Sequence, residues 1–474
     1  MASLSTIPQI ALLILVILVV FNLIIFVHEL GHYWAAKWRG LKIDRFQIWF
    51  GKPIWSKTIN GVQWGLGWIP AGGFVALPQM APMETIEGGN LDREPLPAIK
   101  PIDKIIVAFA GPLFSFLLAL TAAIGVSIVG KPKDFAPTQT IAEVMEGSPG
   151  EKAGLKAGDR ITHINGSPVN GWDGRLDSIF TQIVTSEGDD INFTVERPGE
   201  AKPLQLTSHF EIPPTRWWQR KALRQVGIQP ETGWVYAGNA LKGSPAEAAG
   251  VEDGDRLVSM DGKEFTNPDE VVTYIRSKGE TPIKFVFERK EQLVEMTIRP
   301  RVPLKPEGKN AMLGLSFQPG IVYENHIFKP SAGEQISDTL KQMWLTITRV
   351  ISPKSSLGVG HLSGPVGIFK LQYRMLRMDH PVQRILGFMV LLNINLAILN
   401  MLPFPVLDGG HITLALLEQL KGRPVRAKLL EYVQIGFAML LFSVMIFVTS
   451  KDIGDGIQPG DETKKPEEYV FPAN

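Results

Sequence analysis

Apolar residues gather in four long runs along this chain of 474 residues. The runs cover residues 7 to 27, 105 to 129, 385 to 402 and 433 to 449, and a helix needs roughly 20 apolar residues to cross a bilayer. Residues 1 to 27 contain no lysine or arginine, and no small-residue cleavage site follows, so the first run is not typical of a signal peptide. The pattern predicts a membrane protein with four transmembrane helices, the first continuing to about Trp38.

Short basic flanks predict how these helices are oriented. Lysine or arginine occupies positions 37, 39, 42 and 45 after the first run, 100 and 104 before the second, and 421, 423, 426 and 428 between the third and fourth. Such flanks stay on the cytoplasmic side. We therefore expect both termini and the stretch from about 131 to 380 on the opposite side, which in a Gram-negative cell is the periplasm.

A repeated pattern occupies the stretch between the second and third runs. The segments GSPGEKAGLKAGDRITHING (147 to 166) and GSPAEAAGVEDGDRLVSMDG (243 to 262) align without a gap and are identical at ten of twenty positions. Each copy predicts a turn, a short helix, a second turn and a strand, followed by the alternating runs INFTVER or IKFVFER. We expect two tandem α+β domains, at residues 136 to 225 and 226 to 303.

The shared motif S-P-x-x-x-A-G-[LV]-x-x-G-D-R resembles the PDZ domains of bacterial envelope proteases. A PDZ domain takes an extended peptide onto the edge of its sheet and holds a carboxylate with backbone amides. The resemblance implies that peptide carboxy termini bind here. Alternatively, the grooves stay empty and the two domains act as steric filters, and the sequence leaves both interpretations open.

Three ionisable residues lie at the end of the first apolar run, in FNLIIFVHELGHYWAAKW. His28, Glu29 and His32 would each cost about 2.5 to 3.5 kcal/mol at membrane depth, so they need a compensating partner. Residues four apart share one face of a helix, so both imidazoles can reach one metal ion. In soluble zinc proteases the glutamate of H-E-x-x-H is the general base. The pattern predicts that His28 and His32 bind zinc and that Glu29 is the base.

A hydrolytic zinc site needs a third protein ligand, and a chain without cysteine must supply histidine, aspartate or glutamate. Asp408 is favoured because asparagines and prolines break the apolar run before it. Prolines unwind a helix, and the freed backbone is tolerated only in protein or beside a wet cavity. The residues that break the run are Asn393, Asn395, Asn400, Pro403 and Pro405. The alternatives to Asp408 are His411, Glu418 and Glu431.

The motif HELGH, taken with the segment NMLPFPVLDG at 400 to 409, resembles the N-x-x-P-x-P-x-L-D-G signature of the site-2 proteases, which are intramembrane zinc metalloproteases. The order of parts is similar to that of bacterial members with two PDZ domains, and LSGPVGI at 362 to 368 adds to the resemblance. The resemblance implies that Zn²⁺ is bound by His28, His32 and Asp408, with Glu29 as the base. It also implies substrate contacts, which we assign to Asn400, Pro403 and Pro405.

One position departs from the family pattern. The segment AGPLFSFLLAL keeps the Gly111-Pro112 pair but has Ser115 where relatives often carry asparagine. Serine keeps a hydroxyl, so a polar role at this position is weakened rather than lost.

The stretch from 44 to 77 alternates apolar and polar residues and is rich in glycine. In the family it resembles, this stretch is a membrane-associated β-loop that pairs with the substrate. Glycines permit turns and close backbone approach, and we assign substrate contact to Gly65, Gly67, Gly72 and Gly73. Six of the eleven tryptophans lie in or beside this stretch, so the alternative is that it only contacts lipid headgroups.

These expectations divide the whole chain. The expected parts are a first helix (1–40), the β-loop and a connection (41–99), a second helix (100–130), the two PDZ domains, an amphipathic membrane-proximal segment (304–380), a third span (384–410), a fourth (427–450) and a tail (451–474). The amphipathic segment is interpreted either as a gate or as packing beneath the PDZ pair.

The charge balance adds one exclusion. With 48 basic and 47 acidic residues the chain is not typical of a nucleic-acid binder. The resemblance implies an endopeptidase of the bacterial inner membrane that cuts transmembrane segments of single-span proteins in regulated intramembrane proteolysis. Implied substrates are an anti-sigma factor already shortened by another protease, and signal-peptide remnants. The alternative is a membrane-tethered PDZ scaffold with a non-catalytic metal site.

Overall fold

A computed structural model describes most of the chain. The described residues are 6–80, 97, 99–132, 138–172, 174–230, 233–265, 268–289, 292–305, 310–320, 327–422, 427–455 and 469–472. Parts of the expected connection (81–96) and of the expected tail (456–468) lie outside them. Within the described ranges, four helices are long and apolar enough to cross a membrane. They are α1 (Thr6–Arg39), α3 (Pro101–Val129), α10 (Pro381–Asn400) and α12 (Ala427–Gly454), as the hydropathy pattern predicts.

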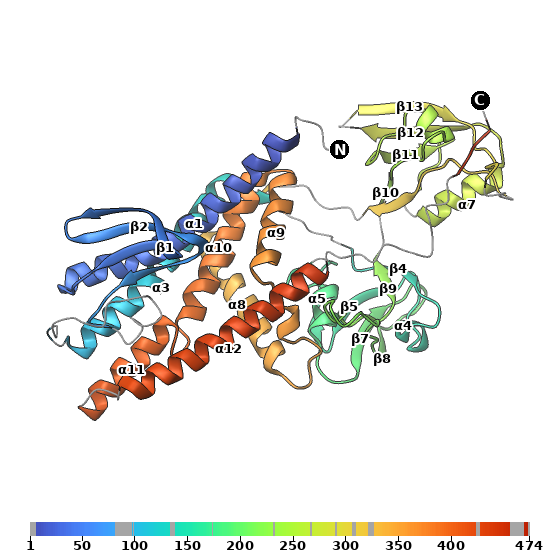
Figure 1. Cartoon of the computed structure of the whole chain (residues 1–474). Helices are drawn as coiled ribbons and strands as arrows, with labels where there is room; N and C mark the ends of the chain where they lie inside the picture. The colour runs from blue at the N-terminus through green and yellow to red at the C-terminus, as the bar shows by residue number, and fades with distance from the viewer. Residues whose placement is uncertain are drawn as a thin grey trace.

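Helix α3 packs against both α1 and α10 (Figure 1). Small residues permit this close packing: Ala119, Ala122 and Ala123 of α3 are buried against an apolar face of α10. Against α1, a side-chain carbon at Gly31 would collide with the carbonyl oxygen of Ala110. The last turns of α1 are therefore held directly against α3, which matters because they carry the histidines.

The third span ends at Asn400, and the chain turns through residues 401–407 before α11 (Asp408–Lys421) begins. Helix α11 also packs on α3. The sequence predicted that the prolines would break the helix, but it treated the residues after Asp408 as a connection. Gly409 and Gly410 permit the turn, because a side chain at either would strike the backbone between Met401 and Pro405.

A sheet of β1 (Arg45–Ile59) and β2 (Val62–Ala76) lies beside α1 (Figure 1). Both strands bend, so residues 45–48 pair with residues 73–76 on one side and with residues 63–66 on the other. Among the described pairings, residues 73–76 therefore form one outer edge of this sheet. Phe46 is buried between the sheet and the aromatic rings of Phe26 and Tyr33 on α1.

Two repeat domains lie together at the other end of the helices (Figure 1). Repeat domain 1 spans residues 138–230 and repeat domain 2 spans residues 233–320. The first contains β4 (Ile141–Val144), α4 (Pro149–Lys152), β5 (Arg160–Ile164), β6 (Ser167–Pro168), α5 (Ile179–Val184), β7 (Ile191–Glu196), β8 (Leu204–Ser208) and β9 (Ile228–Pro230). The second contains β10 (Trp234–Ala237), α6 (Pro245–Ala248), β11 (Arg256–Met260), α7 (Pro268–Lys278), β12 (Ile283–Arg289), β13 (Gln292–Ile298) and β14 (Phe317–Gly320).

The repeated motif makes the same local contacts in both domains. Ser148 and Ser244 each cap the short helix after them by accepting the backbone N–H three residues later. The aspartate of each G-D-R motif is buried and pairs with an arginine at the end of a later strand: Asp159 with Arg197, and Asp255 with Arg289, both at 2.7 Å. Each domain has its own apolar core, with Phe193 at the centre of one and Phe285 at the centre of the other.

Both repeat domains extend past the boundaries expected from the sequence. Strand β9 pairs with β4 beyond residue 225, and β14 pairs with β10 beyond residue 303. These closing strands have only three and four residues, too few for a recognisable alternation.

The expected amphipathic segment contains β15 (Ile327–Phe328), which pairs with β3 (Lys131–Pro132), and then α8 (Ala332–Ile351), the short helix η1 (Val359–His361) and α9 (Pro365–Arg377). Repeat domain 1 contacts this segment, since Glu187 pairs with Arg349 at 2.9 Å and Arg224 donates to Ser356 at 2.6 Å. Repeat domain 2 instead contacts the C-terminal end of the chain, where Val470 exchanges backbone hydrogen bonds with Lys305.

Candidate metal and active site

Helix α1 presents the H-E-x-x-H residues in its C-terminal part. His28 is buried, and His32 lies one turn further along the same face. Their Nε2 atoms are 3.3 Å apart. Helix α1 is one of the four candidate membrane spans. Its two imidazoles point into the helix bundle, where Gly111 of α3 lies against both.

Asp408, the first residue of α11, faces the same point. Its Oδ2 atom is 3.3 Å from Nε2 of His28, and its Oδ1 atom is 3.4 Å from Nε2 of His32. We call His28, His32 and Asp408 the donor group, because their potential ligand atoms all lie within 4.8 Å of one another. The structure therefore brings together two residues of the first helix and one that follows more than 370 positions later.

The spacing of these donor atoms fits a zinc ion. In a tetrahedral site with bonds of 2.0 to 2.1 Å to nitrogen and oxygen, ligand atoms lie about 3.3 to 3.4 Å apart. The two histidine nitrogens are 3.3 Å apart, and each lies 3.3 or 3.4 Å from one of the two aspartate oxygens, which are distances of that size. Two imidazoles and one carboxylate are also a donor set that zinc accepts in hydrolytic sites.

The second nitrogen of each histidine has a partner on α3. Nδ1 of His32 donates to the carbonyl oxygen of Val107 at 2.8 Å. Because a carbonyl oxygen only accepts, the proton is on Nδ1, and Nε2 keeps a lone pair that can bind a metal ion. Nδ1 of His28 lies 2.9 Å from the hydroxyl of Ser115, which is fully buried. Ser115 thus makes a polar contact through its hydroxyl, at a position where the sequence predicted a weakened polar role.

Gly111 leaves the space that these imidazoles occupy. A Cβ atom at this position would lie 2.9 Å from Nε2 of His28 and would overlap the ring of His32. The sequence identified Gly111 only as part of a family pattern, and its steric role was not predicted. Val107 was missed entirely, because the contact uses a backbone atom that carries no sequence signal.

Glu29 directly follows His28 on α1 and lies against the sheet. A Cβ atom at Gly73 would be 3.2 Å from Cγ of Glu29 and 2.9 Å from the side chain of Ile25, so β2 passes directly over α1 here. Gly73 belongs to the outer edge formed by residues 73–76. The proposed base and an outer strand edge are therefore adjacent.

The other predicted β-loop glycines lie within the sheet rather than at Glu29. Gly67 faces the carbonyls of Trp49 and Phe50, Gly72 adopts a φ of 66° against the ring of Phe50, and Gly65 contacts the carbonyl of Trp55. Of the four predicted glycines, only Gly73 borders Glu29 in the contacts described.

A polar clamp, which the sequence did not predict, ties the sheet to α1. Trp49 has a φ of 67°, a conformation that bulky residues rarely adopt, and its indole N–H donates to Oδ1 of Asn22 on α1 at 2.7 Å. The amide of buried Gln47 donates to the carbonyls of Trp49 and Gly51 at 2.9 and 2.8 Å. Asn22 was visible as a polar residue in an apolar run, but nothing in the sequence identified its partner.

The remaining predicted residues are placed as follows. The amide nitrogen of Asn400 lies 3.4 Å from Nε2 of His28, at the border of the donor group. Pro403 and Pro405 lie in the turn before Asp408, and Gln434 of α12 donates to the carbonyl of Pro405 at 3.2 Å.

Among the described residues, the donor group contains none of the alternative ligands. Glu418 pairs instead with Lys104 of α3 at 2.7 Å. His411 follows Asp408 by one turn of α11, and Glu431 belongs to α12.

Known proteins match nearly the whole chain. The model of "Peptidase family M50" matches residues 16–443. A Neisseria meningitidis protein provisionally named a zinc metalloprotease is 30% identical over 90% of this chain and 95% of its own length. The regulator of sigma-E protease RseP of Salmonella typhimurium is 27% identical over 90% of this chain and 94% of its own, and that of Escherichia coli is 25% identical over the same shares.

Among solved structures, the PDZ domain of an SdrC-like protein from Listeria innocua aligns with 20% of this chain at 23% identity, with a TM-score of 0.16. The assignment rests instead on the family match and on the curated relatives, which cover the membrane helices and the site together. The chain belongs to peptidase family M50 and is a zinc metalloprotease of the site-2 type.

Proposed function

We propose that this protein is an intramembrane endopeptidase that cuts transmembrane segments of single-span proteins. One observation carries the proposal: His28, His32 and Asp408 converge at zinc-ligand spacing among apolar helices, with Glu29 adjacent. A hydrolytic zinc site among membrane-spanning helices is placed to act on substrates that are themselves in the membrane.

In this proposal His28, His32 and Asp408 hold Zn²⁺, oriented by Ser115 and Val107. When bound, the ion supplies Lewis acidity, which polarises a carbonyl and makes water a nucleophile near neutral pH. Glu29 takes the proton of the attacking water and passes it to the departing amine nitrogen as the peptide bond breaks. Asn400 contributes an amide beside the reacting group.

The proposed route of the substrate uses the edge at residues 73–76. A transmembrane helix hides its peptide bonds in its own hydrogen bonds, and an unwound segment in lipid needs replacement partners. An outer strand edge offers unpaired backbone groups, and this edge passes over Glu29 at Gly73. The alternative, in which the sheet only contacts lipid headgroups, does not explain why an outer strand edge lies beside Glu29.

For the repeat domains we propose PDZ folds on the periplasmic side of a bacterial inner membrane. Their shared motif, antiparallel sheets and duplicated caps support this assignment. They either bind the new carboxy terminus of a shortened substrate or exclude substrates that have not been shortened. Relatives named regulator of sigma-E protease support an anti-sigma factor as the substrate, and signal-peptide remnants are a second candidate class.

The test is Glu29→Gln, which keeps the shape of the side chain and removes the base. General acid–base catalysis contributes about 10²- to 10⁴-fold, so cleavage of a single-span substrate in detergent or vesicles should fall by that factor while bound zinc stays at the wild-type level. Glu431→Gln, a carboxylate change on α12 outside the donor group, is the control. Unchanged cleavage by a zinc-loaded Glu29→Gln enzyme would leave the membrane-tethered scaffold as the better explanation.

A further inference from the structure

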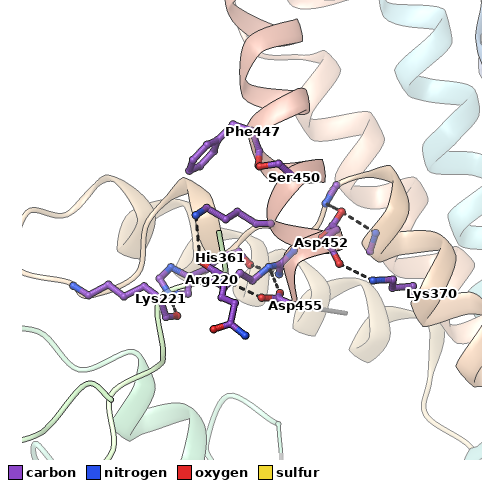
Figure 2. A network of polar contacts seen from close by, with 12 residues as sticks. Arg220, Lys221, His361, Lys370, Phe447, Ser450, Asp452 and Asp455 are labelled. Atoms are coloured by element: carbon purple, nitrogen blue, oxygen red, sulfur yellow. Dashed lines mark hydrogen bonds and ion pairs between the residues drawn. The ribbon is translucent and has the colours of Figure 1, made fainter. Parts of the chain in front are cut away.

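One loop of repeat domain 1, between β8 and β9, has an unusual composition. Residues 215–221, with the sequence TRWWQRK, contain two tryptophans and three basic residues. The catalytic proposal uses none of them. This loop lies against the end of α12, at residues 447–455 (Figure 2).

Charged contacts fasten this loop to the end of α12. The guanidinium of Arg220 pairs with Asp452 and Asp455, and the backbone N–H of Arg220 donates to Asp455 at 3.0 Å. In the opposite direction, Nζ of Lys451 donates to the carbonyls of Trp217 and Gln219 at 2.6 and 3.1 Å. This loop of seven residues is thus held by three residues at the end of α12, Lys451, Asp452 and Asp455.

Asp452 is itself fixed on its other side. Its buried carboxylate accepts the backbone N–H groups of Gly364 and Gly367, at 3.0 and 2.8 Å, at the start of α9. Nζ of Lys370 donates to the carbonyl oxygen of Asp452 at 2.6 Å (Figure 2). A side chain at Gly364 or Gly367 would collide with this carboxylate. These glycines belong to the segment LSGPVGI, so the motif has a structural task here.

The segment is held at the level where a bilayer surface is expected. The candidate span of α12 runs from Leu430 to Gly454, so Phe447 and Lys451 lie in its last two turns. Phe442 and Ile446, just before them, are exposed on the same helix. Thr215, Trp217, Lys221, Gly360, Phe447 and Lys451 line a pocket of about 350 Å³ at this boundary.

The outward side chains of the segment suit phospholipid headgroups. Trp217 is 84% exposed, and an exposed indole is favoured at a membrane interface, where it meets both apolar and polar surroundings. Arg216 and Lys221 are exposed on either side of it, and positive charges near a membrane surface attract anionic lipids.

We propose that residues 215–221 are a membrane anchor for repeat domain 1. Trp217 lies in the headgroup layer, Arg216 and Lys221 contact anionic phospholipid headgroups, and Arg220 fastens the anchor to α12 through Asp452 and Asp455. Repeat domain 1 is therefore held at the membrane surface by lipid as well as by protein, whereas repeat domain 2 has no such segment among its described residues.

The chain has no cysteine, so a single introduced cysteine can report the position of the anchor. The full-length variant Trp217→Cys is labelled with a fluorophore and placed in nanodiscs of phosphatidylcholine and phosphatidylglycerol with headgroup-nitroxide lipid. Leu293→Cys is the matched control, because Leu293 is 67% exposed on β13 of repeat domain 2. We expect severalfold stronger quenching at position 217 than at 293, and equal quenching at both would overturn the proposal.

Two further variants test the parts of the anchor. Arg220→Gln in the Trp217→Cys background should reduce the quenching, and Arg220→Lys should restore part of it; quenching that survives Arg220→Gln unchanged would refute the fastening role. Changing Arg216 and Lys221 together to glutamine should abolish the difference between nanodiscs with and without phosphatidylglycerol. If the unsubstituted anchor shows no such difference, the headgroup role of the two cations is wrong.

Discussion

The metal site and the repeat domains contain buried polar groups of different kinds. In the site, each group depends on a partner from a distant part of the chain: Asp408 meets His28 and His32, and Ser115 meets His28. In the repeat domains the buried charge has a nearer partner and occurs twice, as Asp159 with Arg197 and as Asp255 with Arg289. A substitution in the site therefore removes a contact that occurs once in the described residues and should reduce zinc binding or cleavage. A substitution in one repeat domain should destabilise that domain and leave the equivalent ion pair of the other domain intact.

The largest effect is expected for Asp408→Asn. The amide keeps the size of the side chain but loses the negative charge that a zinc ligand of this type supplies. We expect zinc stoichiometry and cleavage to be lost together, as measured by metal analysis of the purified protein and by a cleavage assay. His411→Gln, one turn further along α11, should keep both. Full zinc content and activity in Asp408→Asn would move the third ligand to one of the alternatives.

A smaller loss is expected when a residue behind a ligand changes. Ser115→Ala removes the hydroxyl that orients His28, and the loss of such an outer contact typically lowers metal affinity or activity about 10- to 100-fold. Competition with a chelator measures the affinity. Ser443→Ala is the control, because that hydroxyl donates only to its own helix at Met439. Equal zinc affinity in both variants would argue against the orienting role.

The clamp on the sheet should matter less, and without affecting zinc. Trp49→Phe keeps an aromatic ring but leaves the Asn22 oxygen unpaired. The lost hydrogen bond should cost about 1 to 2 kcal/mol, which corresponds to about a 5- to 30-fold change. We expect the cleavage rate to fall by that factor, and mass spectrometry of the products should show a broader set of cut positions. Trp38→Phe, an exposed indole at the end of α1, should have no effect. Zinc loss in Trp49→Phe would show that the clamp supports the metal site instead.

The smallest functional effect is expected in the repeat domains. Arg289→Gln leaves the buried Asp255 carboxylate unpaired, which should destabilise repeat domain 2 by about 2 to 3 kcal/mol. Arg197→Gln should do the same to repeat domain 1. Hydrogen exchange of the full-length protein measures both, through protection of β11–β12 and of β5–β7. If either variant deprotected both sheets, the two copies would not be independent.

Acid should act on the same contact. Burial raises the pKa of Asp255, but hydrogen bonds from Arg289 and from the Glu252 N–H outweigh it, so the pKa lies below its usual range. A lowered pKa in the folded state gives stability that is present above the ordinary aspartate range and is lost as the pH falls below it. Arg289→Gln should therefore shift the loss of protection of β11–β12 to a higher pH.

The sequence predicted what local patterns encode. The four apolar runs, the spacing of His28 and His32, and the repeated capping motif each depend on residues that are close in sequence. It also predicted Asp408 as the third ligand, because the prolines before it mark an interrupted helix, and the structure places Asp408 beside both histidines.

Contacts between distant segments were not predictable. The carbonyl of Val107, the space at Gly111, helix α11 and the pairing of Trp49 with Asn22 arise only when separate elements pack together. The closing strands β9 and β14 were missed for a related reason, since each is defined by its partner rather than by its own pattern.

The division of the ligand set between α1 and α11 has a consequence for biosynthesis. The ribosome delivers His28 and His32 to the membrane early, but Asp408 follows 376 positions after His32. With the proposed roles, a half-made chain therefore holds two of the three zinc ligands and the base without a complete metal site. Under the proposed function, cleavage would therefore begin only after Asp408 has been synthesised and α11 has packed on α3.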